Sequence, residues 1–279
     1  MSAGDRMKTT YLNVGCGKRF CKGEPWVNLD VGSADASVVP WDVRAGLPME
    51  SETVDVVYLS HVLEHFSEEA GARLAAECCR VLKPDGILRV VVPDLEGICR
   101  EYLRQLEEIR SAPPGHPDRL AWIKLELLDQ CSRHESGGSM KTFFHERGRD
   151  DLDYVVDRIG TVGIQLAKAS PAPAGKEGRH EERSRLSIRE RLLEALLRPE
   201  EAEALRVGRF RLGGEVHLHM YDSFSLEQVL KGAGFRRVEF RDADTSRIAD
   251  WSSYHLDRDP DGREHAPHSL YAEAGKGPA

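Results

Sequence analysis

The sequence has no long apolar run, no closely paired cysteines and no excess of positive charge. No stretch approaches the roughly 18 apolar residues that cross a bilayer, so no membrane span is expected. Lys and Arg number 39 against 47 Asp and Glu, and a net charge of -8 argues against a nucleic-acid partner. The six cysteines form no Cys-x-x-Cys pair, and the first residues lack the apolar segment of a signal peptide. These absences predict a soluble, cytoplasmic protein with free thiols.

Short apolar runs alternate with turn residues over the first hundred positions, which is typical of a parallel sheet. A run at 68–82 has apolar side chains at helical spacing and ends at Lys83-Pro84-Asp85-Gly86. The expected strands are 11–14, 26–29, 38–41, 54–60 and 87–92.

The same pattern resumes near Tyr221, after a long interruption. A helix is expected from Ser225, with Ser225 and Gln228 as a capping box, and strands at 236–240 and 269–274. The sequence therefore predicts a core made of 1–100 and 221–279 and a mainly helical insertion at 101–220. Within the insertion we expect helices at 95–110, 118–133 and 183–198, and a disordered loop near 170–183.

Glycines and acids follow the first strands in an order that suits a nucleoside-bearing ligand. The run 11–14 ends in Gly15-Cys16-Gly17, and the next two runs end in Asp30 and Asp42. Glycine lets the backbone approach a ligand closely, and a carboxylate at the end of the next strand can accept hydrogen bonds from both ribose hydroxyls. The sequence thus predicts a cofactor site at the carboxyl ends of the strands.

Six segments in order resemble the class I S-adenosylmethionine-dependent methyltransferases, in particular the group called type 11. The matching segments of this chain cover roughly residues 10–100 and 221–275, and the insertion has no counterpart in the family pattern. The segments are Leu12–Gly17, Asn28–Asp30, Asp42 with Leu47-Pro48, Val54–Val57 leading to Ser60–His65, Arg80–Gly86, and Leu230–Phe235.

The resemblance implies a Rossmann-like α/β fold with a seven-stranded, mostly parallel sheet whose last strand is antiparallel. It implies S-adenosyl-L-methionine as the cofactor, with the turn Val14-Gly15-Cys16-Gly17 beside its methionine part and Asp30 on its ribose. By the same resemblance Asp42 and the Val43 backbone contact the adenine, and Ser60 and His61 lie near the sulfonium.

Two features depart from the family pattern. Asn13 stands where the family usually has an acid that helps to hold the amino group of the cofactor. Gly15 and Asp30 are so close in sequence that the usual first crossover helix must be short or absent.

Histidines supply the candidate catalytic groups. His61 and His217 are the leading general-base candidates, needed only if the accepting atom carries a proton. His61 and His65 are four residues apart, and His217 and His219 form a His-x-His pair, so both pairs suggest metal ligands. The local sequence supplies no third ligand for His61 and His65, and a His-x-His pair alone does not establish a metal site, so we expect no metal and a structural role for His65.

Two polar patterns in and after the insertion suggest an acceptor pocket. On the 118–133 helix one face carries Trp122, Glu126, Asp129 and Arg133, either as a solvated face with salt bridges or as part of the pocket. If 215–221 is extended, Glu215, His217, His219 and Tyr221 share a face. The expected acceptor-binding residues are Asp129, Arg133, His219 and Tyr221.

The function favoured by these observations is O-methylation of a small molecule or a saccharide hydroxyl. A catalytically silent methyltransferase-like module for binding or assembly is the alternative, and Asn13 motivates it. A nicotinamide-dependent oxidoreductase is disfavoured, because the third glycine of the dinucleotide fingerprint would fall at Phe20.

Overall fold

The computed structural model describes residues 9–146, 151–168 and 196–277. The sequence expectations for 170–183 and for most of 183–198 lie outside these residues. The strands are β1 Tyr11–Val14, β2 Trp26–Asp30, β3 Val38–Pro40, β4 Val54–Ser60, β5 Leu82–Pro93, β6 Arg237–Arg241 and β7 Ser269–Gly275. The helices are α1 Glu68–Val81, α2 Leu95–Ser111, α3 Pro117–Ser132, α4 Gly138–Glu146, α5 Leu152–Lys168, α8 Pro199–Leu212 and α9 Ser223–Gly232, and short 3-10 turns are η1 Val43–Ala45, η2 Leu63–His65 and η4 Trp251–Tyr254.

The strands form one seven-stranded sheet in the order β3-β2-β1-β4-β5-β7-β6. The pairs among β1 to β5 are parallel, and β7 is antiparallel to both β5 and β6. This confirms the expected mostly parallel sheet with an antiparallel last strand. The β4–β5 register shifts between Val54 and Val56, and the predicted turn at 83–86 lies within β5 at this irregularity.

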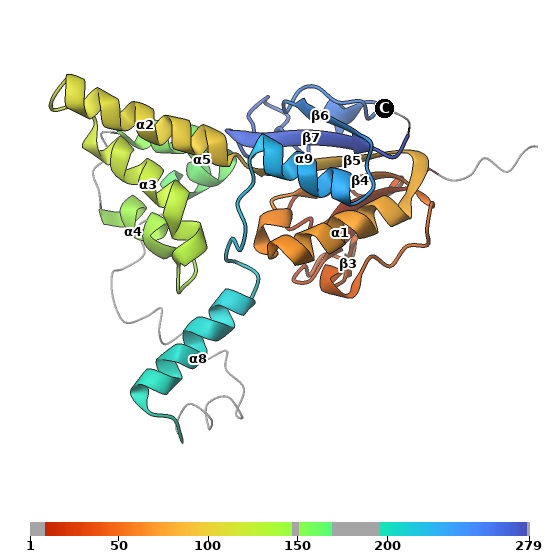
Figure 1. Ribbon diagram of the computed structural model, residues 1–279, viewed down its shortest axis with the longest axis horizontal. Helices are drawn as coiled ribbons and strands as arrows, with labels where there is room; N and C mark the ends of the chain where they lie inside the picture. Colours follow the sequence, from red (N-terminus) through yellow and green to blue (C-terminus); the bar gives the residue numbers. More distant parts are fainter. Residues whose placement is uncertain (1–8, 147–150, 169–195, 278–279) are drawn as a thin grey trace, which may run out of the picture.

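Helices α1 and α9 cover one face of the sheet and lie side by side (Figure 1). The Ser67 hydroxyl caps α1, whose buried face includes Leu74 and Cys78. Alternate strand residues such as Val57 and Leu59 point to this face and join the same apolar core, as the period of two along a strand requires. The expected start of α9 is wrong: Asp222 caps it and forms the capping box with Ser225, because the Asp222 carboxylate accepts the Ser225 N–H.

Irregular chain, not helix, covers the opposite face of the sheet. The links β1–β2 and β2–β3, all of whose residues are described, contain turns and no helix, which confirms the short first crossover. The segment between β6 and β7 takes the place of helices there, with Trp251 and Leu256 packed on Trp26 and Tyr58.

A buried cluster of charges ties this covering segment to the sheet. The Arg89 guanidinium, fully buried on β5, forms ion pairs with Asp257 at 2.8 Å and with Glu273 of β7 at 2.9 Å. Asp257 also accepts hydrogen bonds from the Tyr58 hydroxyl and the Trp251 indole N–H. Each charge in this cluster therefore has partners that compensate the loss of water.

Replacing Asp257 with Ala should destabilise the fold by about 3–5 kcal/mol, because Arg89 would lose a buried counterion. Denaturant unfolding of the two proteins measures the difference. Asp261→Ala is the control, since that side chain is 60% exposed and its loss should cost no more than about 0.5 kcal/mol. Equal losses in the two variants would contradict this account.

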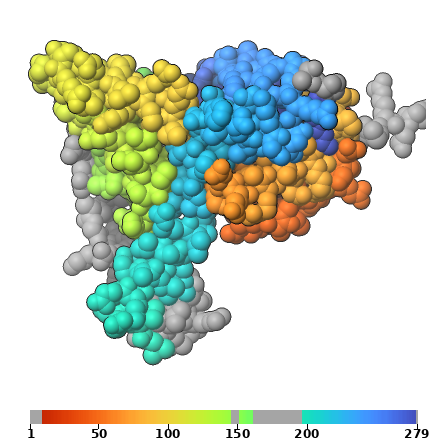
Figure 2. All heavy atoms as spheres, in the orientation of Figure 1, coloured from red at the N-terminus to blue at the C-terminus, as the bar shows by residue number. Residues whose placement is uncertain are grey.

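Helices α2 to α5 form a lobe beside the sheet, and α8 lies apart from both (Figure 1). The predicted helices at 95–110 and 118–133 are confirmed as α2 and α3, whereas α4, α5 and α8 have no counterpart in the sequence expectations. The segment between α8 and α9 lies between the lobe and the sheet (Figure 2). It hydrogen-bonds to both, through His217 N–H to the Gln130 carbonyl and Leu218 N–H to the Glu64 carbonyl.

Candidate functional site

The glycine turn after β1 lies beside the carboxyl end of β2, as parallel pairing of the two strands requires. Val14 pairs with Leu29, and the Cys16 N–H donates to the Leu29 carbonyl. The Asp30 carboxylate accepts the Gly17 N–H and the Gly32 N–H, each at 2.8 Å. Backbone contacts therefore fix this carboxylate at the edge of the turn.

The arrangement of Asp30 fits a ribose. A carboxylate has about four acceptor positions, and these two bonds use one on each oxygen, which leaves acceptor capacity for two hydroxyls. Gly17 has a positive φ of 54°, and a Cβ placed there would meet no atom within 4 Å, so the turn is open on that side. The residues present thus suit the nucleoside of S-adenosylmethionine.

Gly15 is required for a different reason. Its φ is +63°, and a Cβ at this position would lie 2.6 Å from a methyl group of Val62. The turn and the chain after β4 therefore pack directly on each other, which brings the end of β4 beside the proposed cofactor position.

Asn13 braces the glycine turn from inside the fold. The side chain is buried, and its amide donates to the Arg19 carbonyl at 3.0 Å. A carboxylate could not make this bond because it has no proton to donate at neutral pH. The departure from the family pattern thus has a structural use.

The remaining predicted cofactor residues lie around the same edge. Asp42 caps η1, and its carboxylate binds the Arg44 backbone N–H and guanidinium, so hydrogen bonds to Arg44 lower the pKa of Asp42. Val43 is the first residue of η1, and Ser60 ends β4 beside Val91. The Cys16 thiol is buried, which raises its pKa to about 12, with a smaller effect of the Asp30 charge. Cys16 is therefore a neutral packing residue of the turn at neutral pH.

His61 and His217 both lie close to Glu64, although they are far apart in the sequence. His61 directly follows β4 with a φ of +55°, and its Nδ1 lies 3.0 Å from the fully buried Glu64 carboxylate. Its Nε2 lies 3.2 Å from the Ser269 hydroxyl. His217 is buried and its ring centroid is 4.9 Å from that of His65.

Sequence reasoning missed Glu64, although an acid between Leu63 and His65 in an apolar run was a usable signal. Burial works to raise the pKa of Glu64, but the close approach of His61 Nδ1 and the charges of His61, His217 and His65 bring it below its usual value. Burial is also the main cause that lowers the pKa of His217 to about 4. At neutral pH the cluster formed by Glu64 and the three histidines around it therefore holds an anionic Glu64 carboxylate and a neutral His217.

Of the expected acceptor residues, Asp129 and Arg133 are engaged in contacts within the insertion. Asp129 accepts the Ser139 N–H at the start of α4 and pairs with Arg133, which also contacts Glu215. Trp122 and Glu126 on the same face are buried as well, and Glu126 pairs with Arg158 of α5. The interpretation of this stripe as a solvated face is wrong, because the stripe packs on α4 and α5.

His219 and Tyr221 adjoin the cluster but differ in exposure. Their rings are 4.6 Å apart, and Tyr221 lies in the main apolar core with its hydroxyl close to Gly71 of α1. The regular alternation expected for 215–221 is absent, since Val216 and His217 are both buried.

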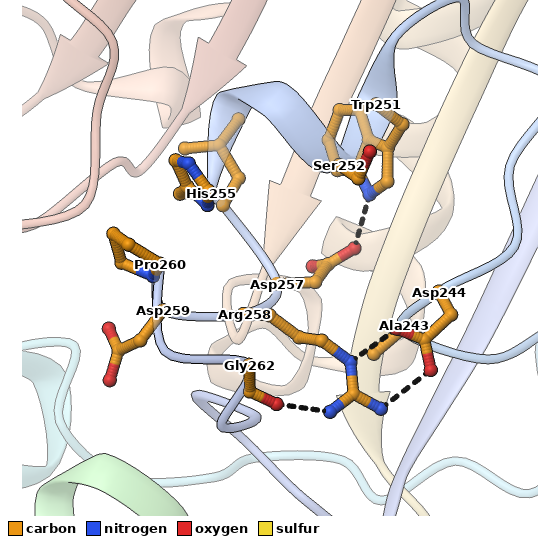
Figure 3. Close-up of a pocket in the computed structure, with 11 residues that line it drawn as sticks. Ala243, Asp244, Trp251, Ser252, His255, Asp257, Arg258, Asp259, Pro260 and Gly262 are labelled. Carbon is orange, nitrogen blue, oxygen red and sulfur yellow. Dashed lines mark hydrogen bonds and ion pairs between the residues drawn. The ribbon is translucent and has the colours of Figure 1, made fainter.

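One cavity, of about 210 Å³, lies in the segment between β6 and β7 (Figure 3). Its lining runs from Ala243 to Gly262, and Arg258 closes one side through Asp244 and the Gly262 carbonyl. None of the predicted cofactor residues lines it. We therefore assign it no part in the site at the glycine turn.

Comparison with known proteins supports the assignment of the fold. Residues 26–90 match the family model described as a methyltransferase domain. No curated protein matches the chain.

Three solved structures that are similar to this chain have low sequence identity to it. A possible histamine N-methyltransferase from Thermotoga maritima is 11% identical over 96% of this chain and 82% of its own, with a TM-score of 0.37. The PH0226 protein from Pyrococcus horikoshii is 22% identical over 36% of this chain and 55% of its own, with a TM-score of 0.27. A methyltransferase from Archaeoglobus fulgidus is 21% identical over 43% of this chain and 61% of its own, with a TM-score of 0.28. The match thus spans little more than half the length of the last two proteins, and TM-scores this low carry no argument.

Gly15→Ala should destabilise the fold more than Gly17→Ala, by at least about 1 kcal/mol. In both variants an alanine has to adopt a left-handed backbone conformation, which destabilises the folded state by about 1–2 kcal/mol. Only Gly15→Ala also displaces Val62. Chemical unfolding without cofactor measures both. Equal losses would show that the approach of Val62 does not constrain the turn.

Within the described residues, no helix is both long and apolar enough to cross a bilayer. The order of the sheet and the antiparallel β7 agree with the fold that the resemblance to S-adenosylmethionine-dependent methyltransferases implies, and residues 26–90 are similar to a methyltransferase domain.

Proposed function

We propose that the protein transfers the methyl group of S-adenosylmethionine to a hydroxyl of a small molecule or a saccharide. The observation that carries the proposal is the Asp30 carboxylate, fixed by two backbone N–H groups at the open side of the glycine turn. The cofactor supplies a methyl group on a positively charged sulfur that is already a good leaving group. The protein then has to hold an acceptor oxygen in line with that methyl group, and orientation accounts for most of the rate.

A hydroxyl acceptor also needs a group that takes its proton, and His61 suits this role better than His217. The Glu64 carboxylate faces Nδ1 of His61, as an acid that orients a catalytic imidazole does, and this leaves Nε2 near Ser269 as the basic atom. A base with a pKa of about 4, as at His217, binds few protons at neutral pH. We therefore assign the general base to His61.

The helical insertion at 101–220 is proposed as the cap over the acceptor. Its closing segment, 215–221, is joined to η2 by the Glu64 carbonyl, which accepts the Leu218 and His219 N–H groups, and the Tyr221 ring lies 4.6 Å from the His219 ring. Asp129 and Arg133 support this cap by holding α4 and Glu215. In this proposal they shape the acceptor pocket and do not contact the reacting atoms.

Asp30→Asn should weaken binding of S-adenosylhomocysteine by about 10- to 100-fold, because hydrogen bonds to a charged acceptor contribute about 1.5–3 kcal/mol. Isothermal titration calorimetry of the purified proteins measures the change. Asp35→Asn, in the next turn and paired with Lys22, is the matched control and should bind as the unchanged protein does. Tight binding by Asp30→Asn would place the ribose elsewhere.

The second candidate is a silent binding module, which Asn13 favours because its amide is used within the turn and offers no carboxylate to an amino group. Transfer of labelled methyl from S-adenosylmethionine to a panel of hydroxylated acceptors separates the two functions. Incorporation that His61→Gln reduces supports the enzyme. Binding of S-adenosylhomocysteine without transfer to any acceptor supports the module.

A further inference from the structure

Glu64, His65 and His217 bring three metal-binding groups together from two distant parts of the chain. One ligand atom from each residue lies within 4.8 Å of the others. Two atoms that bind one tetrahedral ion at about 2.1 Å lie about 3.4 Å apart, so rotations of the side chains have to bring these atoms closer together when an ion binds. Sequence reasoning found two of these residues, in separate pairs, and missed the acid that completes the set.

The cluster has unsatisfied buried atoms that point to a ligand. Within the described part of the chain, both Glu64 carboxylate oxygens and Nδ1 of His217 are buried without a hydrogen bond of good geometry. His61 Nδ1 is near one carboxylate oxygen, at 3.0 Å, and leaves the other without a polar partner. Such atoms are costly in a protein interior unless something binds them.

His65 is oriented as a metal ligand is. Its Nδ1 lies 3.3 Å from the Val216 carbonyl, to which it can donate only when the proton is on Nδ1. That tautomer leaves Nε2 with its lone pair free, and a bond from the second ring nitrogen to a carbonyl commonly fixes histidine ligands in this way. The Leu218 and His219 N–H groups bind the Glu64 carbonyl and hold the two chain segments together.

We propose that Glu64, His65 and His217 form a binding site for a divalent transition-metal ion, best suited to Zn²⁺. Two imidazoles and one carboxylate favour zinc over Mg²⁺, which prefers oxygen ligands and octahedral geometry. Three protein ligands leave at least one coordination position open. An acceptor hydroxyl bound there would lose its proton more readily, and this part of the inference rests on the proposed function.

The test uses the full-length protein, with any histidine tag removed and treated with a chelator. Zn²⁺ is titrated by calorimetry, and Co²⁺ by visible absorption, which reports four- or five-coordinate geometry and nitrogen ligands. One equivalent of Zn²⁺ should bind, and Glu64→Gln, His65→Gln and His217→Gln should each weaken it by at least about tenfold. His219→Gln is the matched control, two residues from His217 and outside the cluster, and should bind Zn²⁺ as the unchanged protein does.

Circular dichroism checks that each variant folds. If a ligand variant does not fold, the Co²⁺ spectrum of the unchanged protein decides: bands of a four- or five-coordinate site support the proposal, and the spectrum of hydrated Co²⁺ overturns it. Absence of saturable Zn²⁺ binding, equal weakening in His219→Gln, or tighter binding of Mg²⁺ also overturns it.

Titration of S-adenosylhomocysteine in the same samples separates this inference from the proposed function. Nucleoside binding without Zn²⁺ binding removes the metal site and leaves the methyltransferase. Zn²⁺ binding without nucleoside binding supports the metal site and contradicts the proposed methyltransferase function.

Discussion

Two backbone hydrogen bonds, from the N–H groups of Leu218 and His219 to the Glu64 carbonyl, join the end of the helical insertion to the end of β4. The chain leaves the sheet after β5, and this segment leads back to it at Tyr221, which forms a bridge with Asp94. These two bonds hold the returning segment against η2, where the His217 and His65 rings are 4.9 Å apart. The apolar packing of Tyr221 and Leu226 then places α9 on the sheet, so the candidate site lies where these two kinds of contact meet.

The sheet and the cofactor edge were predictable because local signals there agree with the final fold. Strand β4 is an uninterrupted β-rich run, and Gly15 and Asp30 follow strands that pair in parallel, so their proximity needs no knowledge of distant contacts. The start of α9 shows the limit of such signals. Asp222, Ser223 and Ser225 are all polar residues that can cap a helix, and only the structure shows that Asp222 is the residue that accepts the Ser225 N–H.

The cluster at Glu64 could not be predicted in the same way, because its members meet only through the return of the chain. The sequence offered His61 with His65 and His217 with His219 as two separate pairs, and the fold takes one histidine from each pair and adds Glu64. The polar stripe on α3 failed for a related reason. Spacing alone shows that Trp122, Glu126 and Asp129 share a face, but the packing of α4 and α5 decides that the face is buried.

The face of the sheet without crossover helices between β1 and β3 also carries buried charges. There the irregular segment before β7 brings Asp257 to Tyr58, and it brings Asp257 and two carbonyls to Arg89. The Arg89 guanidinium donates to two backbone carbonyls and to two carboxylates, so its N–H groups are satisfied without water. In this chain, therefore, polar contacts with Arg89 hold the covering segment in place, and the face that carries α1 and α9 relies on apolar packing.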